Sequence, residues 1–173
     1  MAAIVRIANP TADAVERSQM VADSGIDVAA TQVDGTPTDG AVGSLATIAA
    51  IRYAVFVVER GVDVATEWDD YETVAEHVLL VEEGQPIGTA RVRRTDGALK
   101  CERIAVRASA RGAGWGQRLM DICETIAHEH RLDECVLHAQ QRVAEFYRKQ
   151  GYVVVSEPFE EAGIPHVEME KEL

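Results

Sequence analysis

The fold of this chain is decided between Glu102 and Met120, where the sequence reads ERIAVRASARGAGWGQRLM. An apolar strand comes first, followed by a loop with glycines at positions 112, 114 and 116, and then by an amphipathic helix. Because glycines carry no side chain, consecutive backbone N–H groups can converge on an anion, and the start of the helix adds the positive end of its dipole. Arg111 adds a cation beside the loop. The stretch therefore predicts a phosphate-binding loop.

The loop differs from two common nucleotide-binding motifs. It lacks the Lys-Ser/Thr ending of nucleotide triphosphatases, and its glycines alternate instead of following the G-x-G-x-x-G spacing of dinucleotide-binding proteins. Taken alone, it is also compatible with an ordinary turn between a strand and a helix. The rest of the chain has to decide between these two interpretations.

The composition indicates a single acidic domain. With 47% apolar content, 173 residues are enough for one well-packed core. The 17 basic and 29 acidic residues leave a net charge of −12, which argues against nucleic acid and anionic membranes as partners, since both require a basic face. An acidic surface could attract cationic substrates such as polyamines or lysine-rich peptides, or it could serve solubility alone.

The cysteines and the hydropathy pattern bound the cellular context. Cys101, Cys123 and Cys135 form an odd set without C-x-x-C spacing, and no secretory signal peptide precedes them, so neither a disulfide framework nor a zinc site is expected. No apolar run approaches the roughly 18 residues of a membrane span. We expect reduced thiols, no bound metal, and a soluble cytoplasmic protein.

The pattern along the chain predicts a central sheet with helices on both faces. Thr11 or Asp13 can cap a helix that reaches about residue 22, and residues 24–43 carry turn signals typical of a loop or mobile linker. Ser44 can cap a helix with apolar residues at helical spacing, at Leu45, Ile48, Ile51, Val55 and Val58. Residues 2–8 form a short apolar run. Strands are expected at 77–82 and 86–94, joined by a hairpin turn at residues 83–85, and at 100–106, 136–139, 152–156 and 166–170. Further helices are expected at about 143–150 and at about 115–130, the latter with Leu119, Ile122, Cys123 and Ile126 on one face.

In this context the chain resembles the GNAT superfamily of N-acetyltransferases, and within it the ElaA-like branch. The family signature, Arg/Gln-x-x-Gly-x-Gly/Ala between a strand and a helix, is matched by Arg111, Gly114 and Gly116. Residues 51–59 look like the first helix of the branch, residues 138–152 like its fifth strand and following helix, and residues 163–166 like its last turn.

The resemblance covers about residues 45–173 and implies an α/β (α+β) fold of the GNAT type, with a mixed, largely antiparallel central sheet. It divides the chain into a partly flexible N-terminal extension, residues 1–43, and an acetyltransferase domain, residues 44–173. It also implies acetyl-CoA as the acyl donor.

Coenzyme binding is implied for two parts of the chain and one side chain. In the family, the strand equivalent to residues 102–106 splays from its neighbour, so its backbone binds the pantetheine arm and polarises the thioester. Gln140 stands where many relatives carry an asparagine that contacts the coenzyme. The coenzyme-binding residues implied in this way are Ile104, Ala105, Val106, Arg111, Gly112, Ala113, Gly114, Trp115, Gly116 and Gln140.

Three residues are candidates for proton transfer. Tyr147 matches the family's helix tyrosine, which can protonate the departing thiolate, although it could also be a half-buried helix aromatic. For the base that deprotonates the amine, Glu102 lies where some relatives place a glutamate, and His166 carries an imidazole, which titrates near neutral pH. His77 and His138 are weaker candidates.

The amine pocket is expected around the acidic segment, residues 61–76, and Glu59 just before it. Carboxylates at Glu59 and Asp69, with the aromatic rings of Trp68 and Tyr71, could meet an ammonium group by charge and cation–π attraction. A solvated acidic loop is the alternative.

The function predicted from these residues is acetyl-CoA-dependent transfer of an acetyl group directly to a primary amine of a small molecule or peptide. Two alternatives stay open: an acyltransferase like the acyl-homoserine-lactone synthases, and a non-catalytic acyl-CoA sensor. The acceptor and the oligomeric state are undetermined, with a homodimer among the options.

Overall fold

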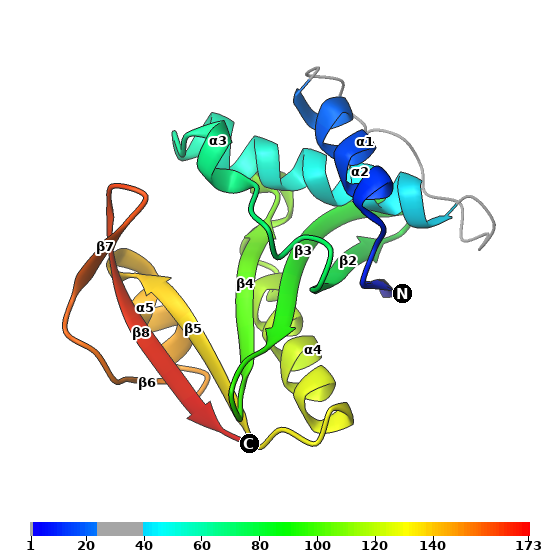
Figure 1. Cartoon of the computed structure of the whole chain (residues 1–173). Coiled ribbons are helices and arrows are strands. Elements are labelled where there is room, and N and C mark those ends of the chain that lie inside the picture. Colours follow the sequence, from blue (N-terminus) through cyan, green and yellow to red (C-terminus); the bar gives the residue numbers. More distant parts are fainter. Residues whose placement is uncertain (1, 24–39) are drawn as a thin grey trace.

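A computed structural model describes residues 2–23 and 40–173 (Figure 1). Within these residues, no helix is long and apolar enough to cross a membrane. The strands are β1 (Ala2–Ala8), β2 (Glu76–Glu82), β3 (Gln85–Arg94), β4 (Leu99–Val106), β5 (Glu134–Gln140), β6 (Val153–Val154), β7 (Phe159–Glu161) and β8 (Ile164–Glu172). The helices are α1 (Ala12–Asp23), α2 (Gly40–Arg52), α3 (Val64–Glu67), α4 (Trp115–Glu129) and α5 (Ala144–Arg148), with a π-helix η2 (Tyr53–Glu59) and 3-10 turns η3 (Ala108–Ala110) and η4 (Gln141–Val143).

The described strands form one open sheet in the order β1-β2-β3-β4-β5-β8-β6, with β7 paired to β8. Among these pairs only β4 and β5 run parallel. The predicted mixed, largely antiparallel sheet is therefore confirmed. Strand β7 was not predicted; it forms a hairpin with β8 through Ala162 and Gly163, whose positive φ angles of 50° and 73° suit a tight two-residue turn.

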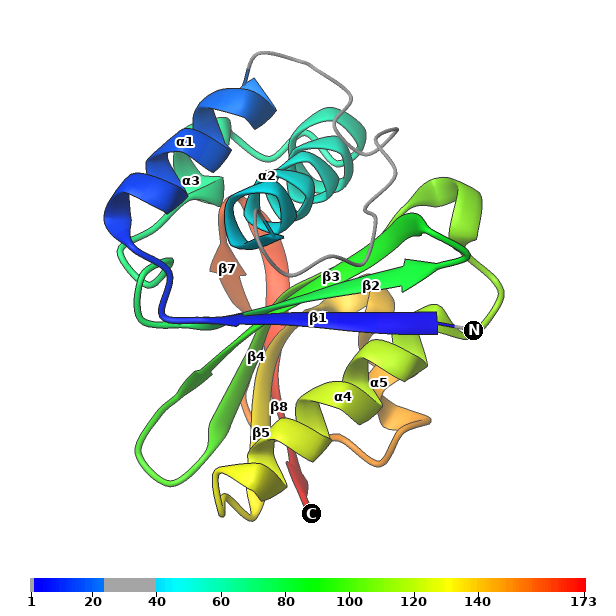
Figure 2. The same ribbon diagram turned by 90° about the vertical axis from the view of Figure 1, so that its right-hand side faces the viewer.

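Helices cover both faces of the sheet, as the sequence pattern predicts. Figure 2 shows α1 and α2 on one side of the strands and α4 on the other. Strand β2 serves both cores because its side chains alternate: Val78 and Leu80 pack with α4, whereas Leu79 and Val81 pack with α2. The residues predicted to form the buried face of α4 are all buried: Leu119, Ile122, Cys123 and Ile126.

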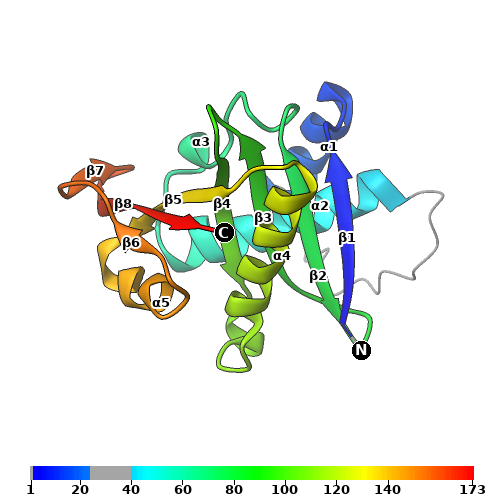
Figure 3. The same ribbon diagram turned by 90° about the horizontal axis from the view of Figure 1, so that it is seen from below.

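The N-terminal strand belongs to the same sheet, since β1 pairs with β2 along its whole length. Thr11 caps α1, its Oγ1 accepting a hydrogen bond from the Ala14 N–H at 3.2 Å. Figure 3 shows α1 beside α2. Residues 24–39 of the expected linker lie outside the described residues. The expected domain boundary at Ser44 falls inside α2, so Ser44 is not the helix cap.

The helix predicted from residue 44 onward changes its winding at Tyr53, where η2 begins. Its apolar positions up to Val55 are buried as predicted, but Val58 is 70% exposed. In a π-helix the hydrogen bonds join residues five apart instead of four, so the angle between successive side chains changes. The prediction that Val58 packs on the sheet was therefore wrong, because it assumed uniform α-helical spacing.

Candidate active site

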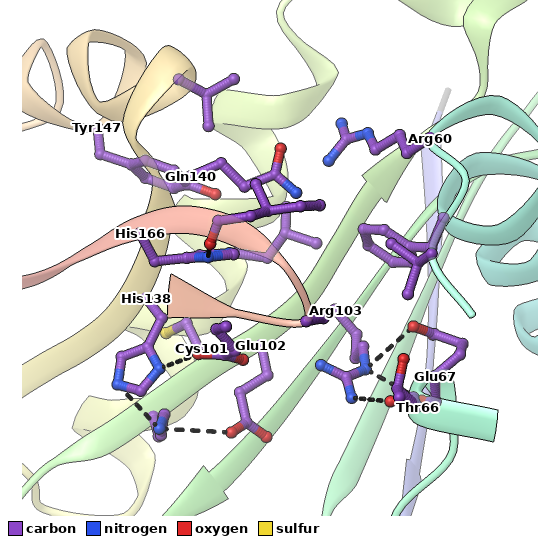
Figure 4. Close-up of a pocket in the computed structure, with 18 residues that line it drawn as sticks. Arg60, Thr66, Glu67, Cys101, Glu102, Arg103, His138, Gln140, Tyr147 and His166 are labelled. Atoms are coloured by element: carbon purple, nitrogen blue, oxygen red, sulfur yellow. Dashed lines mark hydrogen bonds and ion pairs between the residues drawn. The ribbon is translucent and has the colours of Figure 1, made fainter. Parts of the chain in front are cut away.

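A cleft of about 290 Å³ opens where β4 and β5 diverge. It is lined by η2 and the segment after it, by β4, by β5, by Tyr147 of α5, and by the β7–β8 hairpin (Figure 4). Elements from the two halves of the sheet thus meet around one concave site, which is the usual setting for a small-molecule site.

The cleft exists because β4 and β5 pair over only two positions. Leu99 lies opposite Cys135 and Lys100 opposite Val136, after which the parallel register ends. Figure 1 shows the two strands spreading apart beyond this point. From there to its end, β4 has no β5 partner among the described residues, and on that side the carbonyl of Val106 accepts a hydrogen bond from Nε of Arg111.

A β-bulge lies in the same part of β4. Thr89 of β3 pairs with Ala105 and Arg91 pairs with Glu102, so that two residues of β4 oppose the single residue between them. One of the two, Arg103, has a φ of +51°, a left-handed conformation that is uncommon outside glycine. The bulge bends β4 at the point where it leaves β5, and it brings the Arg103 side chain into the cleft lining.

The glycine loop has the conformation of an anion cradle. Gly112 and Gly114 have φ angles of +84° and +85°, and no atom lies within 4 Å of a Cβ built on either residue. Gly114 is the N-cap of the 15-residue helix α4. Gly116 is required for packing instead, because a Cβ there would stand 3.1 Å from Cζ of Phe146. The loop therefore leaves open space in front of a helix N-terminus, which fits a phosphate group.

Arg111 is paired within the protein. Its Nη2 lies 2.9 Å from Oε2 of Glu59, and its Nε donates to the carbonyl of Val106 at 3.0 Å. The hydrogen bond from Arg111 lowers the pKa of Glu59, and the same bond raises the pKa of Arg111. Glu59, expected in the amine pocket, thus stands beside the glycine loop and does not line the cleft.

Tyr147 is buried and lines the cleft. Its ring packs edge-to-face on Phe146, with the centroids 4.9 Å apart. Burial raises the pKa of the Tyr147 hydroxyl above its ordinary value, because the phenolate would lose its hydration. Burial therefore keeps the hydroxyl protonated, so that it can donate a hydrogen bond or a proton but is a weaker acid than an ordinary tyrosine.

His166 is the candidate base whose geometry is most favourable. Its Nδ1 lies 2.7 Å from the carbonyl oxygen of Ile164. A carbonyl can only accept, so Nδ1 carries the hydrogen and the neutral ring keeps a lone pair on Nε2. The ring lines the cleft and stacks on Phe159, with centroids 6.1 Å apart. This arrangement orients a proton acceptor within the site.

Glu102, the other candidate base, lines the cleft but is already engaged. Its Oε2 accepts a hydrogen bond from Nη2 of Arg91 at 2.8 Å, and its Oε1 accepts one from Nε of Arg93 at 3.1 Å. Nζ of Lys100 lies 3.8 Å from the same Oε1. Both oxygens of the carboxylate bind cations, so the geometry favours His166 as the base.

His138 also lines the cleft, where it bridges two carboxylates. Its Nδ1 lies 2.6 Å from Oε2 of Glu161 and its Nε2 3.2 Å from Oε2 of Glu168. The bond to Glu161 raises the pKa of His138, since both partners favour the imidazolium. Nζ of Lys100 also lies 3.3 Å from Nε2, so His138 is already engaged by three charged side chains.

Three residues of the acidic segment that were expected in the amine pocket, Trp68, Asp69 and Tyr71, do not line the cleft. Asp69 Oδ2 lies 2.8 Å from Nη2 of Arg91, which is only 1% exposed. Trp68 packs under the guanidinium of Arg52, 4.5 Å from the ring centroid, and Tyr71 similarly under Arg93 at 3.9 Å. Arginines within the protein already take the place that an ammonium substrate would occupy.

Buried arginines organise this segment. Arg52 is 1% exposed and binds two buried carboxylates, Glu67 through its Nε at 2.6 Å and Glu72 through its Nη1 at 2.8 Å. Arg91 also reaches Glu72, with Nη1 2.6 Å from Oε1. The sequence predictions missed this network, since its partners are distant in the chain.

Gln140 lines the cleft at the end of β5, and its Oε1 accepts a hydrogen bond from Nε of Arg142 at 3.0 Å. Three cations that line the cleft were not predicted as site residues: Arg60, Lys100 and Arg103. No sequence motif marked these three cations, because their place in the cleft depends on how η2, β4 and β5 meet in space.

Comparison with known proteins defines the class. Residues 54–173 match the family described as Acetyltransferase (GNAT) domain. The Bacillus subtilis protein named Uncharacterized N-acetyltransferase YjcF is 40% identical over 123 residues, which cover 70% of this chain and 88% of YjcF. ElaA of Escherichia coli is 32% identical over 137 residues, which cover 76% of this chain and 90% of ElaA. The chain belongs to the GNAT family of acetyltransferases, and the resemblance to ElaA is confirmed.

Solved structures agree with this assignment. A crystal structure from Lactobacillus plantarum matches with a TM-score of 0.72 at 26% identity, covering 99% of this chain and 98% of the other. A GNAT family acetyltransferase from Elizabethkingia anophelis, solved with acetyl-CoA bound, shares the fold with a TM-score of 0.57 at 19% identity and covers 82% of this chain and 94% of its own.

Proposed function

We propose that this chain transfers the acetyl group of acetyl-CoA directly to a primary amine, without a covalent enzyme intermediate. The observation that carries the proposal is the convergence of Tyr147 and His166 on one cleft, at the place where β4 leaves β5. The family assignment supports the reaction class, and the acetyl-CoA in the Elizabethkingia anophelis structure supports the donor.

Two open spaces in the structure indicate which residues would hold acetyl-CoA, one in front of α4 and one along β4 where β5 leaves it. Backbone N–H groups of residues 112–116 would bind its diphosphate at the start of α4. Backbone groups of residues 104–106 that face away from β3, and the side chain of Gln140, would contact the pantetheine arm. Bound there, acetyl-CoA supplies an activated thioester carbonyl.

The residues of the cleft would then manage two protons. Nε2 of His166 takes the proton that the ammonium form of the acceptor must lose before it can attack. The free amine nitrogen bonds to the carbonyl carbon, the carbon–sulfur bond breaks, and the nitrogen releases its second proton, which replaces the one that Tyr147 gives up. Tyr147 donates its hydroxyl proton to the leaving thiolate, and a backbone N–H of the bulged strand stabilises negative charge on the carbonyl oxygen.

Turnover separates this proposal from the alternatives. The sensor hypothesis predicts coenzyme binding without turnover of any amine. Synthesis of acyl-homoserine lactones predicts turnover with an amine that carries a lactone or its precursor, in place of a general amine acceptor. The proposal places the reaction in the cytosol, where buried free thiols such as those of Cys101, Cys123 and Cys135 stay reduced.

The first test is calorimetric titration with acetyl-CoA of wild type, Gly114→Glu and Gly97→Glu. Gly97 is a matched control: it has a φ of +88°, close to that of Gly114, and open space around its Cβ, but it lies in the β3–β4 turn. We expect binding to wild type and Gly97→Glu and its loss in Gly114→Glu. Absence of binding to folded wild type would overturn the proposed donor.

A further inference from the structure

Arg60 is a cation of the cleft that has no anionic partner within the part of the chain that the structure describes. It is half-buried and lines the cleft together with Tyr147 and His166. Its guanidinium points toward the side of the cleft that carries Gln140 (Figure 4). A guanidinium in such a position retains five hydrogen-bond donors for a ligand.

The local structure holds this side chain in place. Arg60 is the C-cap of η2, and its backbone N–H donates to the carbonyl of Val57. Its guanidinium lies over the ring of Phe56, 5.4 Å from the centroid. Since Phe56 also lines the cleft, the ring supports one side of the guanidinium and leaves its edge free. Interruptions of α-helices by π-helical winding are frequent at functional sites.

The surrounding charges leave Arg60 uncompensated. Burial lowers the pKa of Arg60, Arg142 and Arg111 lower it further by repulsion, and Glu59, which is itself paired with Arg111, offsets only part of this. The carboxylates that line the cleft are held by other cations: Glu67 by Arg52, Glu102 by Arg91, and Glu161 by His138. Although the whole chain carries a net charge of −12, the free charge in its cleft is positive.

We propose that Arg60 binds a carboxylate of the acceptor, so that the acceptors of this enzyme are amines that also carry a carboxylate group. This inference rests on the proposed acetyl transfer and specifies its substrate class. Arginine suits the task because its planar fork can donate two parallel hydrogen bonds to a carboxylate. It also disfavours polyamines, whose second ammonium group would meet the Arg60 cation.

A phosphate of the coenzyme is the competing anion, and the structure favours the acceptor. Gly112, Gly114 and Gly116, which would hold the phosphates, do not line the cleft, whereas Arg60 shares it with Tyr147 and His166 and with Ile104 and Gln140, which would contact the uncharged pantetheine arm. The coenzyme diphosphate already has a cradle at the start of α4. Arg60 is thus placed among the groups that would handle the amine.

The test compares pairs of amines that differ only in a carboxylate: lysine with cadaverine, 4-aminobutyrate with propylamine, and phenylalanine with phenethylamine. Release of coenzyme A thiol gives kcat/KM for wild type, Arg60→Gln, Arg60→Lys and the control Arg17→Gln, an exposed arginine on α1. We expect wild type to prefer at least one carboxylated member, and Arg60→Gln to lose about tenfold to a hundredfold of that preference, the range for a hydrogen bond between charged groups. Arg60→Lys should retain part of it, and Arg17→Gln all of it.

Two further measurements make every outcome decisive. Calorimetry of coenzyme A binding shows whether Arg60 binds the acceptor carboxylate or a coenzyme phosphate. Weaker coenzyme binding in Arg60→Gln, with an unchanged preference for carboxylated acceptors, would overturn the inference. A second measurement needs no turnover. It compares how tightly the complex of protein and coenzyme A binds the N-acetylated acids and their counterparts without the carboxylate. If no amine reacts, the proposed function fails, yet tighter binding of the acids that depends on Arg60 would still support the carboxylate site. Equal binding of acids and counterparts would overturn it.

Discussion

Glu59 and Arg111, 52 residues apart, form a two-pronged ion pair beside the glycine loop, with Arg111 Nη2 2.9 Å from Glu59 Oε2. The sequence suggested separate tasks for them, an amine pocket for Glu59 and a phosphate site for Arg111. The pair connects the end of η2 to the loop before α4. Both side chains are about 39% exposed, so a phosphate group can compete with the Glu59 carboxylate for the guanidinium.

The first prediction concerns this competition. Glu59→Gln removes the intramolecular anion, so we expect acetyl-CoA to bind more tightly, by up to about fivefold, because exposed ion pairs contribute roughly 0.2–1 kcal/mol. Calorimetric titration measures the change. Glu145→Gln is the matched control, since Glu145 pairs with Arg148 on the surface of α5. Weaker binding in Glu59→Gln alone would show that the pair holds the loop in its binding conformation.

The second prediction isolates the acid. Tyr147→Phe should lower kcat by about a hundredfold or more, the usual range for a general acid, and leave the Kd for acetyl-CoA within twofold of wild type, roughly. Tyr152→Phe is the control, because Tyr152 belongs to the same aromatic cluster but does not line the cleft. A kcat that survives the loss of the Tyr147 hydroxyl would transfer the acid role to water or to another residue.

The third prediction concerns the buried arginine network. Arg52→Met leaves Glu67 and Glu72 buried without this cation, and breaking a buried ion pair costs about 3–5 kcal/mol of unfolding free energy. Urea unfolding measures the loss. Arg17→Met, which removes an exposed i,i+4 pair with Asp13, should cost under about 1 kcal/mol. Similar small losses in both variants would show that water replaces Arg52.

The fourth prediction is a pH dependence of stability. The pKa of His138 is raised in the folded protein by Glu161, above the unfolded value of about 6.5. The stabilisation is therefore fully present below about pH 6.5 and disappears as the pH rises through the folded-state pKa. His138→Gln should cost more unfolding free energy at about pH 6 than at about pH 9. A cost independent of pH would mean that His138 stays neutral when folded.

Predictions from sequence succeeded where the cause is local. The glycine loop depends on residues adjacent in the chain, since the left-handed φ angles of Gly112 and Gly114 are a property of glycine itself. The hairpin between β2 and β3 was likewise predicted from its own turn. Gly84 supplies one of its two positive φ angles and Glu83 the other.

Predictions from sequence failed where the environment of a residue depends on partners that are distant in the chain. An acidic segment in water can attract an ammonium group, and nothing within residues 61–76 shows that Arg52 and Arg91 will be buried against it. The change from α-helix to π-helix at Tyr53 could not be predicted either. The apolar pattern of the sequence continues past Tyr53, and only the exposure of Val58 in the structure shows that the winding has changed.

The sequence by itself determined the GNAT class and the largely antiparallel sheet, through ordered motifs that resemble the family, and it determined the conformation of the glycine loop, because glycine conformations depend on a few neighbouring residues. Only the tertiary structure decided which charges are free. Coulomb attraction depends on distance in space, and folding pairs the carboxylates of Glu67, Asp69 and Glu102 with arginines while it leaves Arg60 open in the cleft.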